Sequence, residues 1–288
     1  MSEHMSTFAF PSDIERLIFE CASRDDTQTA LRLALVSRRA QCWVESIIYR
    51  FVNLYPARTK NAFIQSLEVT TKPSSFYNRC IKILFLPFCR TFKREWGDDI
   101  ETAVKLLPYC QGAEYVFLWI SPDYVDMRLK DLLINMRPKR LDADLMNLLG
   151  ATQPDFSLPF FDNVTHLVIS QAPKNCIAIR ALPHLSHFLI DWIDKNVMPD
   201  DCNLLKVAAD LLSHSETLKV CAIRYVDANV DTVLPELQDG RLVFIIAVID
   251  WFPHWLSFAR GELDIWAYAE AAVTKQTQQG GRIEPIRC

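Results

Sequence analysis

Histidines are the residues of this sequence best suited to acid–base chemistry, but their spacing assembles no site. His184 and His187 lie three residues apart, which on a helix would place both on one face, yet here they flank the start of an expected strand. We interpret these two, and also His166 and His214, as ordinary surface or junction residues. No G-x-S-x-G, H-E-x-x-H, P-loop or Rossmann motif occurs in the sequence. We therefore predict no catalytic residue, no cofactor and no enzymatic activity.

The cysteines also lack the spacing of a metal site. Nine are spread singly along the chain, no two form a C-x-x-C pair, and no cysteine and histidine spacing matches a zinc site. In a reducing compartment such residues behave as small buried hydrophobic side chains. We predict no bound metal. The nine are Cys21, Cys42, Cys80, Cys89, Cys110, Cys176, Cys202, Cys221 and Cys288.

Residues suited to binding are easier to find, because polar and aromatic side chains follow several of the expected strands. Ligands usually bind at the carboxyl ends of the strands in open parallel sheets. Tryptophan, tyrosine and arginine also dominate many protein interfaces. The candidate partner-binding residues are Asp191, Trp192, Arg224, Tyr225 and Trp251. An alternative stays open, in which these side chains, Trp251 above all, pack into the core.

The elements that would position these residues are strands alternating with helices. Short apolar or alternating segments recur about 20 to 35 residues apart, a spacing found in leucine-rich and related repeats. Strands separated by helices form parallel sheets, because parallel neighbours need a crossover connection. The expected strands are residues 80–85, 113–120, 141–145, 164–169, 185–190, 218–223 and 242–249. The expected helices between them are residues 98–107, 123–136 and 200–212.

The C-terminal part should contain one more helix and then a tail. A helix beginning near Gly261 has acidic residues in its first turn, as the helix dipole favours. We expect its aromatic side, which carries Trp266, to close the C-terminal end of the sheet. Residues 277–288 are polar and contain glycine, which predicts a flexible tail.

Composition and charge narrow the class of protein. Half of the 288 residues are hydrophobic, so the chain can bury a sizeable core. Residues 141–288 carry 11 basic and 19 acidic side chains, and this acidic half makes nucleic acid a poor partner. The first residues show no secretory signal, and the most apolar stretch, 242–249, is shorter than the roughly 20 residues that span a bilayer. We expect a cytoplasmic or nuclear protein that is neither secreted nor bound to a membrane.

The N-terminal residues 10–51 predict three short helices with one apolar surface left uncovered. The first helix should begin at Ser12, and its apolar residues follow the i, i+3, i+4 spacing of a one-sided helix. In the second helix, the seven positions from Ala30 to Val36 contain Arg32 as their only polar residue. Such a helix must be covered on two sides, either by its own protein or by a partner.

The same stretch resembles a known family. It resembles the F-box through the sequence LALVSRR...WVE...YR and through Pro11, Ile14, Ile18 and Trp43. The resemblance is greatest to the F-box-like proteins abundant in mushroom-forming (basidiomycete) fungi. The resemblance implies docking on the Skp-type adaptor of a cullin-RING ubiquitin ligase. The adaptor-facing residues that it implies are Phe10, Pro11, Ile14, Leu31, Leu35 and Val36. This sequence departs from the family pattern in three places. Phe10 stands where leucine is usual, Ala40 stands where tryptophan is common, and residues 23–29 form a polar insertion.

Together these features predict an α/β protein with three parts. Residues 1–55 would form an F-box-like helical module, residues 56–276 an irregular leucine-rich-repeat-like solenoid with a parallel sheet and a C-terminal capping helix, and residues 277–288 the tail. The function implied is the substrate receptor of an SCF-type ubiquitin ligase, which binds the adaptor and an unknown protein target. In the alternative interpretation, the N-terminal helices only cap the solenoid of a non-ligase interaction scaffold.

Overall fold

A computed structural model describes most of the chain and divides it into two compact units, Met1–Phe51 and Val52–Cys288. The division falls four residues before the boundary predicted at residue 55. Each unit is described by itself. The described residues are 10–24, 26–54, 57–88, 99–120, 127–145, 154–170, 177–192, 204–225, 239–246, 257–258, 262, 264–278 and 286–287.

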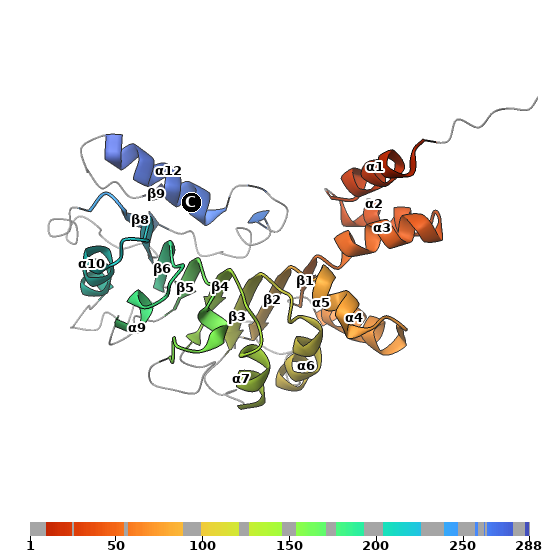
Figure 1. The fold of residues 1–288 in the computed structure, drawn as a ribbon, viewed down its shortest axis with the longest axis horizontal. Coiled ribbons are helices and arrows are strands. Elements are labelled where there is room, and N and C mark those ends of the chain that lie inside the picture. The colour runs from red at the N-terminus through yellow and green to blue at the C-terminus, as the bar shows by residue number, and fades with distance from the viewer. Residues whose placement is uncertain are drawn as a thin grey trace, which may run out of the picture. The chain divides into compact units, whose positions relative to one another are not determined.

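The first unit consists of three helices, α1 (Ser12–Arg24), α2 (Thr27–Ala34) and α3 (Arg38–Ile48) (Figure 1). Side chains that precede α2 and α3 set their starts. The Asp26 carboxylate accepts hydrogen bonds from the backbone N–H groups of Gln28 and Thr29, at 3.0 and 2.9 Å. The Ser37 hydroxyl accepts one from the N–H of Ala40 at 3.0 Å. These bonds satisfy donors that the first helical turn leaves without a partner.

The core of this unit is small. Ala30, Ala40 and Val44 are buried in it, and the rings of Phe19 and Trp43 lie 6.0 Å apart between centroids. Two of these three buried apolar residues are alanines, so the three helices pack closely but bury little apolar surface. Most of the large apolar side chains of α1 and α2 are therefore left outside this core.

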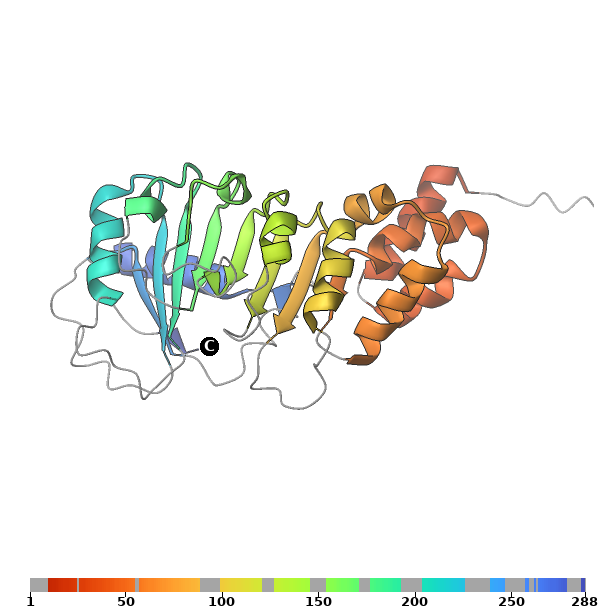
Figure 2. The same ribbon diagram turned by 90° about the horizontal axis from the view of Figure 1, so that it is seen from below.

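The second unit is built on one sheet of nine strands, whose spatial order follows the chain from β1 to β9 (Figure 2). Every pairing from β2 to β9 is parallel. This confirms the prediction of an α/β fold with a parallel sheet. The strands are β1 (Phe51–Asn53), β2 (Ile83–Phe88), β3 (Tyr115–Ile120), β4 (Arg140–Ala143), β5 (His166–Ile169), β6 (His187–Trp192), β7 (Val220–Tyr225), β8 (Leu242–Ile246) and β9 (Ile286–Arg287).

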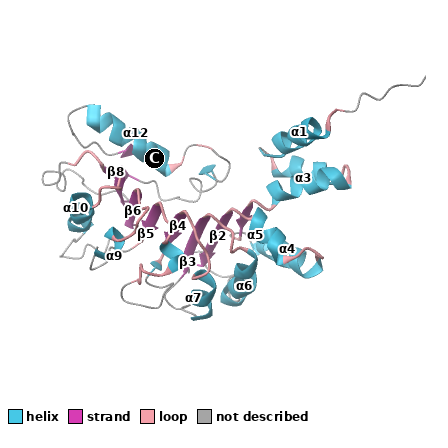
Figure 3. Cartoon of the chain, viewed as in Figure 1, coloured by secondary structure: helices cyan, strands magenta, loops and turns pink. Residues whose placement is uncertain are grey.

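Helices cover the sheet unequally. One face carries a row of helices that connect consecutive strands, and the opposite face carries α12 (Ile265–Gln278) (Figures 1 and 3). The connecting helices are α4 (Ala57–Val69), α5 (Ser74–Cys80), α6 (Asp99–Leu106), α7 (Met127–Leu133), α9 (Ile177–Arg180) and α10 (Leu204–His214), with short 3-10 turns at Leu107–Tyr109 and Pro159–Phe161. Alternate strand residues point to opposite faces, so each strand contributes to two packed layers.

All seven expected strands are present, although four of them begin two residues later than expected. The expected strand start at Cys80 is instead the last residue of α5. The described parts of the expected helices at 98–107, 123–136 and 200–212 form α6, α7 and α10. Strands β1 and β9 and helices α4 and α5 were not predicted, because each is short or weakly patterned.

The C-terminal part differs from the sequence prediction in two ways. Helix α12 lies across the face of strands β5 to β8 instead of closing the end of the sheet, since Trp266 and Ala269 pack on Val168, Leu189 and Val220 of that face. The predicted flexible tail at 277–288 includes the end of α12 and strand β9, whose Ile286 pairs with Ile245 of β8. A sheet edge left open has unpaired backbone groups, and β9 satisfies those of β8.

Close packing between α5 and the turn before β3 gives the first testable prediction. A methyl group added at Gly112 would collide with the carbonyl group of Asn78, whose carbon would lie only 2.8 Å away. Backbone atoms cannot turn aside as a flexible side chain can. We expect Gly112→Ala to lower the free energy of unfolding by about 1–3 kcal/mol, the usual range for overpacking, in urea titrations followed by circular dichroism.

Gly240 provides the matched control, because a methyl group there would meet only the Thr277 hydroxyl at 3.8 Å, an ordinary contact distance. We expect Gly240→Ala to stay within about 1 kcal/mol of the wild type. Equal stability of the two variants would contradict the close approach at Gly112.

A candidate docking surface on the N-terminal helices

The apolar stripe of α1 faces outward. Ile14, Leu17 and Ile18 follow the i, i+3, i+4 spacing and are exposed. The side of α1 that is turned inward instead carries Phe19, whose ring contacts Trp43, and Ser23, which is 2% exposed. An amphipathic helix normally buries its apolar stripe in its own domain. Helix α1 presents that stripe to its surroundings.

Polar contacts hold α1 in this orientation. The Glu15 carboxylate pairs with the guanidinium of Arg39 on α3, and that guanidinium also lies over the Trp43 ring, 5.1 Å from its centroid. The Ser23 hydroxyl donates to the carbonyl of Phe19 at 2.6 Å, which satisfies it inside the helix. Glu15, Phe19 and Ser23 thus lie on the inner side of α1, and the exposed apolar residues lie on the other side.

The end of α2 adds further apolar side chains. Leu31 is exposed, and α2 ends at Ala34, so Leu35 and Val36 lie in the turn before α3. Leu35 is 86% exposed, the largest value among the exposed large apolar residues of the described chain. No described residue of its own unit covers this side chain.

Taken together, these residues form an unusual concentration of exposed apolar side chains. Of the eleven exposed large hydrophobic residues in the described part of the chain, seven lie between Phe10 and Val36. Single exposed apolar residues are common on protein surfaces, but a group of them marks an interaction site. We call this group the N-terminal apolar surface. It consists of Phe10, Pro11, Ile14, Leu17, Ile18, Leu31, Leu35 and Val36.

All six residues expected to face an adaptor belong to the N-terminal apolar surface. The prediction of their binding role stays a prediction, but each side chain is exposed as that role requires. Leu17 and Ile18 were missing from the predicted set. They share the helical stripe of Ile14, so the i, i+3, i+4 spacing was the pattern that could have identified them.

The N-cap of α2 adds a fixed negative charge close to this surface. Hydrogen bonds from the Thr29 hydroxyl and from the backbone N–H groups of Gln28 and Thr29 hold the pKa of Asp26 below its usual value. The carboxylate therefore stays ionised and keeps the start of α2 in place.

The second predicted site lies on the sheet and has a different character. Asp191 on β6 and Arg224 on β7 face each other in register. The Arg224 Nε donates to Asp191 Oδ1 at 2.7 Å, and its Nη2 pairs with Asp191 Oδ2. Both residues are buried, with Asp191 only 2% exposed. These two charges therefore bind each other across the strands.

The remaining residues of that predicted site are only partly described. Trp192 and Tyr225 pair as the last residues of β6 and β7, and Trp251 lies outside the described residues. Burial raises the pKa of Asp191, and the Arg224 guanidinium opposes that shift. A partner-binding role for these five residues stays a prediction, and the structure adds a role for Asp191 and Arg224 in joining two strands.

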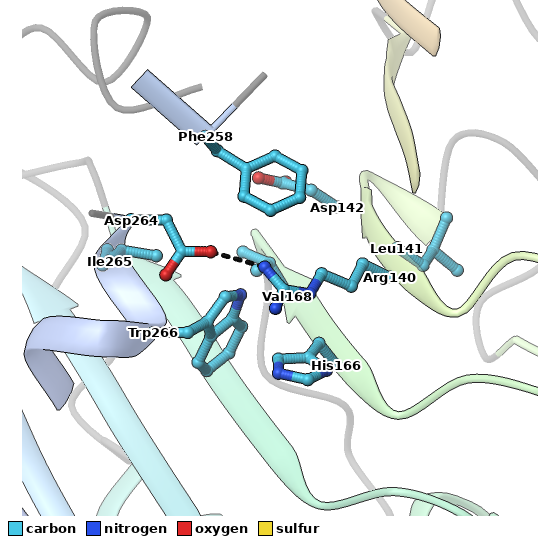
Figure 4. A pocket seen from close by; sticks show the side chains of 9 residues that line it. All are labelled: Arg140, Leu141, Asp142, His166, Val168, Phe258, Asp264, Ile265 and Trp266. Carbon is cyan, nitrogen blue, oxygen red and sulfur yellow. Dashed lines mark hydrogen bonds and ion pairs between the residues drawn. The ribbon is translucent and has the colours of Figure 1, made fainter. Parts of the chain in front are cut away.

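A small pocket lies where β4 and β5 meet the start of α12 (Figure 4). Its volume of about 50 Å³ is enough for a few water molecules. The guanidinium of Arg140 pairs with Asp264 there and lies 5.2 and 4.7 Å from the ring centroids of Tyr115 and Phe258. Because an acidic side chain already neutralises Arg140, the pocket has no strong preference for an anionic ligand, and we assign it none.

The cysteines behave largely as expected where they are described. Cys80, Cys110 and Cys221 are buried, and burial raises the pKa of Cys110 to about 12, so its thiol stays protonated. Cys21 and Cys42 are exposed on α1 and α3, which differs from the expected burial. Within the described residues no group of three or more histidine, cysteine, aspartate or glutamate side chains is placed to hold a metal ion.

Comparison with known proteins adds no relative. No family model, no curated protein and no solved structure matches this chain. Among the described helices, none combines the length and hydropathy that crossing a membrane requires.

The buried ion pair gives the second prediction. Replacing Arg224 by alanine would leave the Asp191 carboxylate buried without its main partner, and breaking such pairs costs about 3–5 kcal/mol. We expect Arg224→Ala to lower the free energy of unfolding by that amount in urea titrations. The control is Arg128→Ala, because Arg128 pairs with Glu101 on the surface, with side chains 53% and 62% exposed. That substitution should cost about 0–1 kcal/mol. Similar losses in both variants would show that the buried pair has no special role.

Proposed function

We propose that this protein is the substrate-recognition subunit, of the F-box type, of a cullin-RING ubiquitin ligase. Its first unit would dock on a Skp-type adaptor, and its second unit would bind a protein target that the sequence does not identify. The observation that carries the proposal is the outward orientation of the apolar stripe of α1, together with the exposure of Leu31, Leu35 and Val36.

The energetics of this surface favour a stable partner. Fully burying one leucine or isoleucine side chain contributes about 1.5–3 kcal/mol, so several of them together offer a large gain on docking. Leu35 and Val36, in the turn after α2, would contribute most per residue, because they are the most exposed of the aliphatic residues in this surface. The positions that the F-box resemblance assigns to the adaptor are among these same residues, which supports the choice of a Skp-type adaptor as occupant.

The architecture of the second unit supports the other half of the proposal. Its strands follow one another in the order of the chain, each joined to the next by a crossover, as in a leucine-rich-repeat-like solenoid of irregular period. Repeated units of this kind create extended surfaces for protein partners. The receptor would contribute proximity between the target and a ubiquitin-carrying enzyme, with no bond chemistry of its own.

The third prediction tests adaptor docking directly. We expect the full chain, co-expressed with the Skp-type adaptor of the same organism, to elute as a one-to-one complex in size-exclusion chromatography. The double variant Leu35→Asp/Val36→Asp should lose this complex, because docking would then require two carboxylates to leave water. Its circular dichroism spectrum should match the wild type, since both residues are exposed and lie outside the core.

Val69→Asp is the matched control, because Val69 is a similarly exposed aliphatic residue, at 78%, but lies on α4 of the second unit. This variant should keep the adaptor. Co-elution of the double variant with the adaptor would refute the proposed docking surface. Absence of any complex with the wild type, with the chain soluble alone, would favour the scaffold whose N-terminal helices only act as a cap.

A further inference from the structure

Helix α12 covers strands β5 to β8 on the face opposite the connecting helices. Beneath it lies a continuous apolar cluster from β5 to β8, against which Ile265, Trp266, Ala269, Ala272 and Val273 pack. The cluster residues on the strands are Val168, Leu189, Val220, Ala222, Val243 and Ile245. Movement of α12 away from the strands would therefore expose this apolar cluster to a greater extent.

Two histidines lie under the first turn of α12. His166 on β5 and His187 on β6 are register partners, and their rings stack with centroids 4.1 Å apart and planes only 3° from parallel. Both rings meet the indole of Trp266 nearly at right angles, at 5.2 and 5.4 Å. The pair is therefore packed directly against the aromatic residue that anchors α12.

The charged groups around this pair do not favour two protonated rings. Lys219, at the start of β7, and Arg140, on β4, disfavour positive charge on both imidazoles. Arg140 is itself paired with Asp264, which also caps α12 by accepting the N–H of Ala267 at 2.9 Å. The acidic group that contacts the pair is Glu270 on α12, whose Oε1 lies 2.9 Å from Nε2 of His187.

Hydroxyl groups complete the surroundings. The Nδ1 atom of His166 lies 2.8 Å from the Thr165 hydroxyl, and that of His187 lies 2.8 Å from the Ser186 hydroxyl. A hydroxyl can donate to a neutral imidazole nitrogen or accept from a protonated one, so these contacts hold the rings without fixing their charge. Direct stacking of the rings makes a second positive charge costly.

We propose that the His166–His187 pair makes α12 a pH-sensitive strap, which seats on the strand face while the rings are neutral and lifts from it as they gain protons. Lifting uncovers the apolar cluster of β5 to β8. This device lies wholly within the second unit and does not depend on the proposed adaptor function.

The direction of the pH effect follows from the two states. Burial, followed by the charge of His187, lowers the pKa of His166 to about 2 when α12 is seated. Burial also lowers the pKa of His187, and Glu270 opposes that shift. With α12 lifted, the burial that lowers both pKa values is relieved, and the pKa of each ring rises toward its ordinary value of about 6.5. The lifted state thus binds more protons, so its population rises as the pH falls below about 6.5.

The size of the effect can be stated as a range. From pH 7.5 to pH 5.5, one histidine that is neutral in the seated state and titrates with a pKa of about 6.5 in the lifted state raises the lifted-to-seated ratio about 10-fold. Two such histidines raise it about 100-fold. We expect a value between these limits, because Glu270 lets His187 accept a proton partly in the seated state.

The fourth prediction measures this ratio by hydrogen–deuterium exchange of the full chain at pH 7.5 and pH 5.5, with rates corrected for the intrinsic effect of pH. The protection factors of the α12 amides should fall about 10- to 100-fold at the lower pH. Strands β2 and β3 contribute no residue to the apolar cluster beneath α12, so the protection factors of their amides should change less than about 3-fold. In His166→Phe, which keeps a flat ring that gains no proton, the fall in α12 should be about 10-fold smaller.

The exposed His184 provides the control, since His184→Gln should leave the pH dependence of α12 unchanged. If His166→Phe fails to fold at pH 7.5, His166→Gln, which retains a partner for the Thr165 hydroxyl, carries the same expectation. Three results would overturn the proposal. These are protection of α12 that does not depend on pH, a parallel loss in α12 and in β2 and β3, and a full pH effect in the His166 variant.

Discussion

The ladder of parallel backbone hydrogen bonds from β2 to β9 is the constraint on which the second unit depends. It extends beyond the strands themselves, since the N–H of Lys139 donates to the carbonyl of Glu114 at 2.7 Å and that of Lys219 to Ser186 at 2.7 Å. Each parallel pair requires the chain to return across the sheet, so a helix or turn must follow every strand. The row of connecting helices on one face is the direct result.

The opposite face had to be covered in another way. Strand residues alternate between faces, so covering one face with connecting helices leaves the second apolar row of β5 to β8 in need of a cover. Helix α12 supplies it, and the ionisable groups at its start and middle meet charged or titratable side chains of the strands: Asp264 meets Arg140, and Glu270 meets His187. The cover of this face thus combines apolar packing with groups whose charge depends on pH.

The first unit differs from the second, because it leaves an apolar surface exposed. Its core is made mostly of small residues, and the side of α1 that faces α3 carries Glu15, which pairs with Arg39, and the buried Ser23. Exposing the apolar stripe costs this unit stability on its own, and that cost is recovered only when another surface covers the stripe. A docking module and a self-sufficient domain differ in this respect. Because its large apolar residues between Phe10 and Val36 are exposed, we propose that this unit is a docking module.

The sequence by itself determined the local elements and the α/β class, because hydrophobic periodicity and capping residues act over a few positions. Seven strands appear, as their apolar patterns predicted, and the local side chains Asp26 and Ser37 cap α2 and α3. Only the tertiary structure decided which side of α1 faces outward, that α12 crosses the strand face, and that Asp191 binds Arg224, 33 residues away. These outcomes depend on register between strands and on contacts between distant segments, which no local pattern contains.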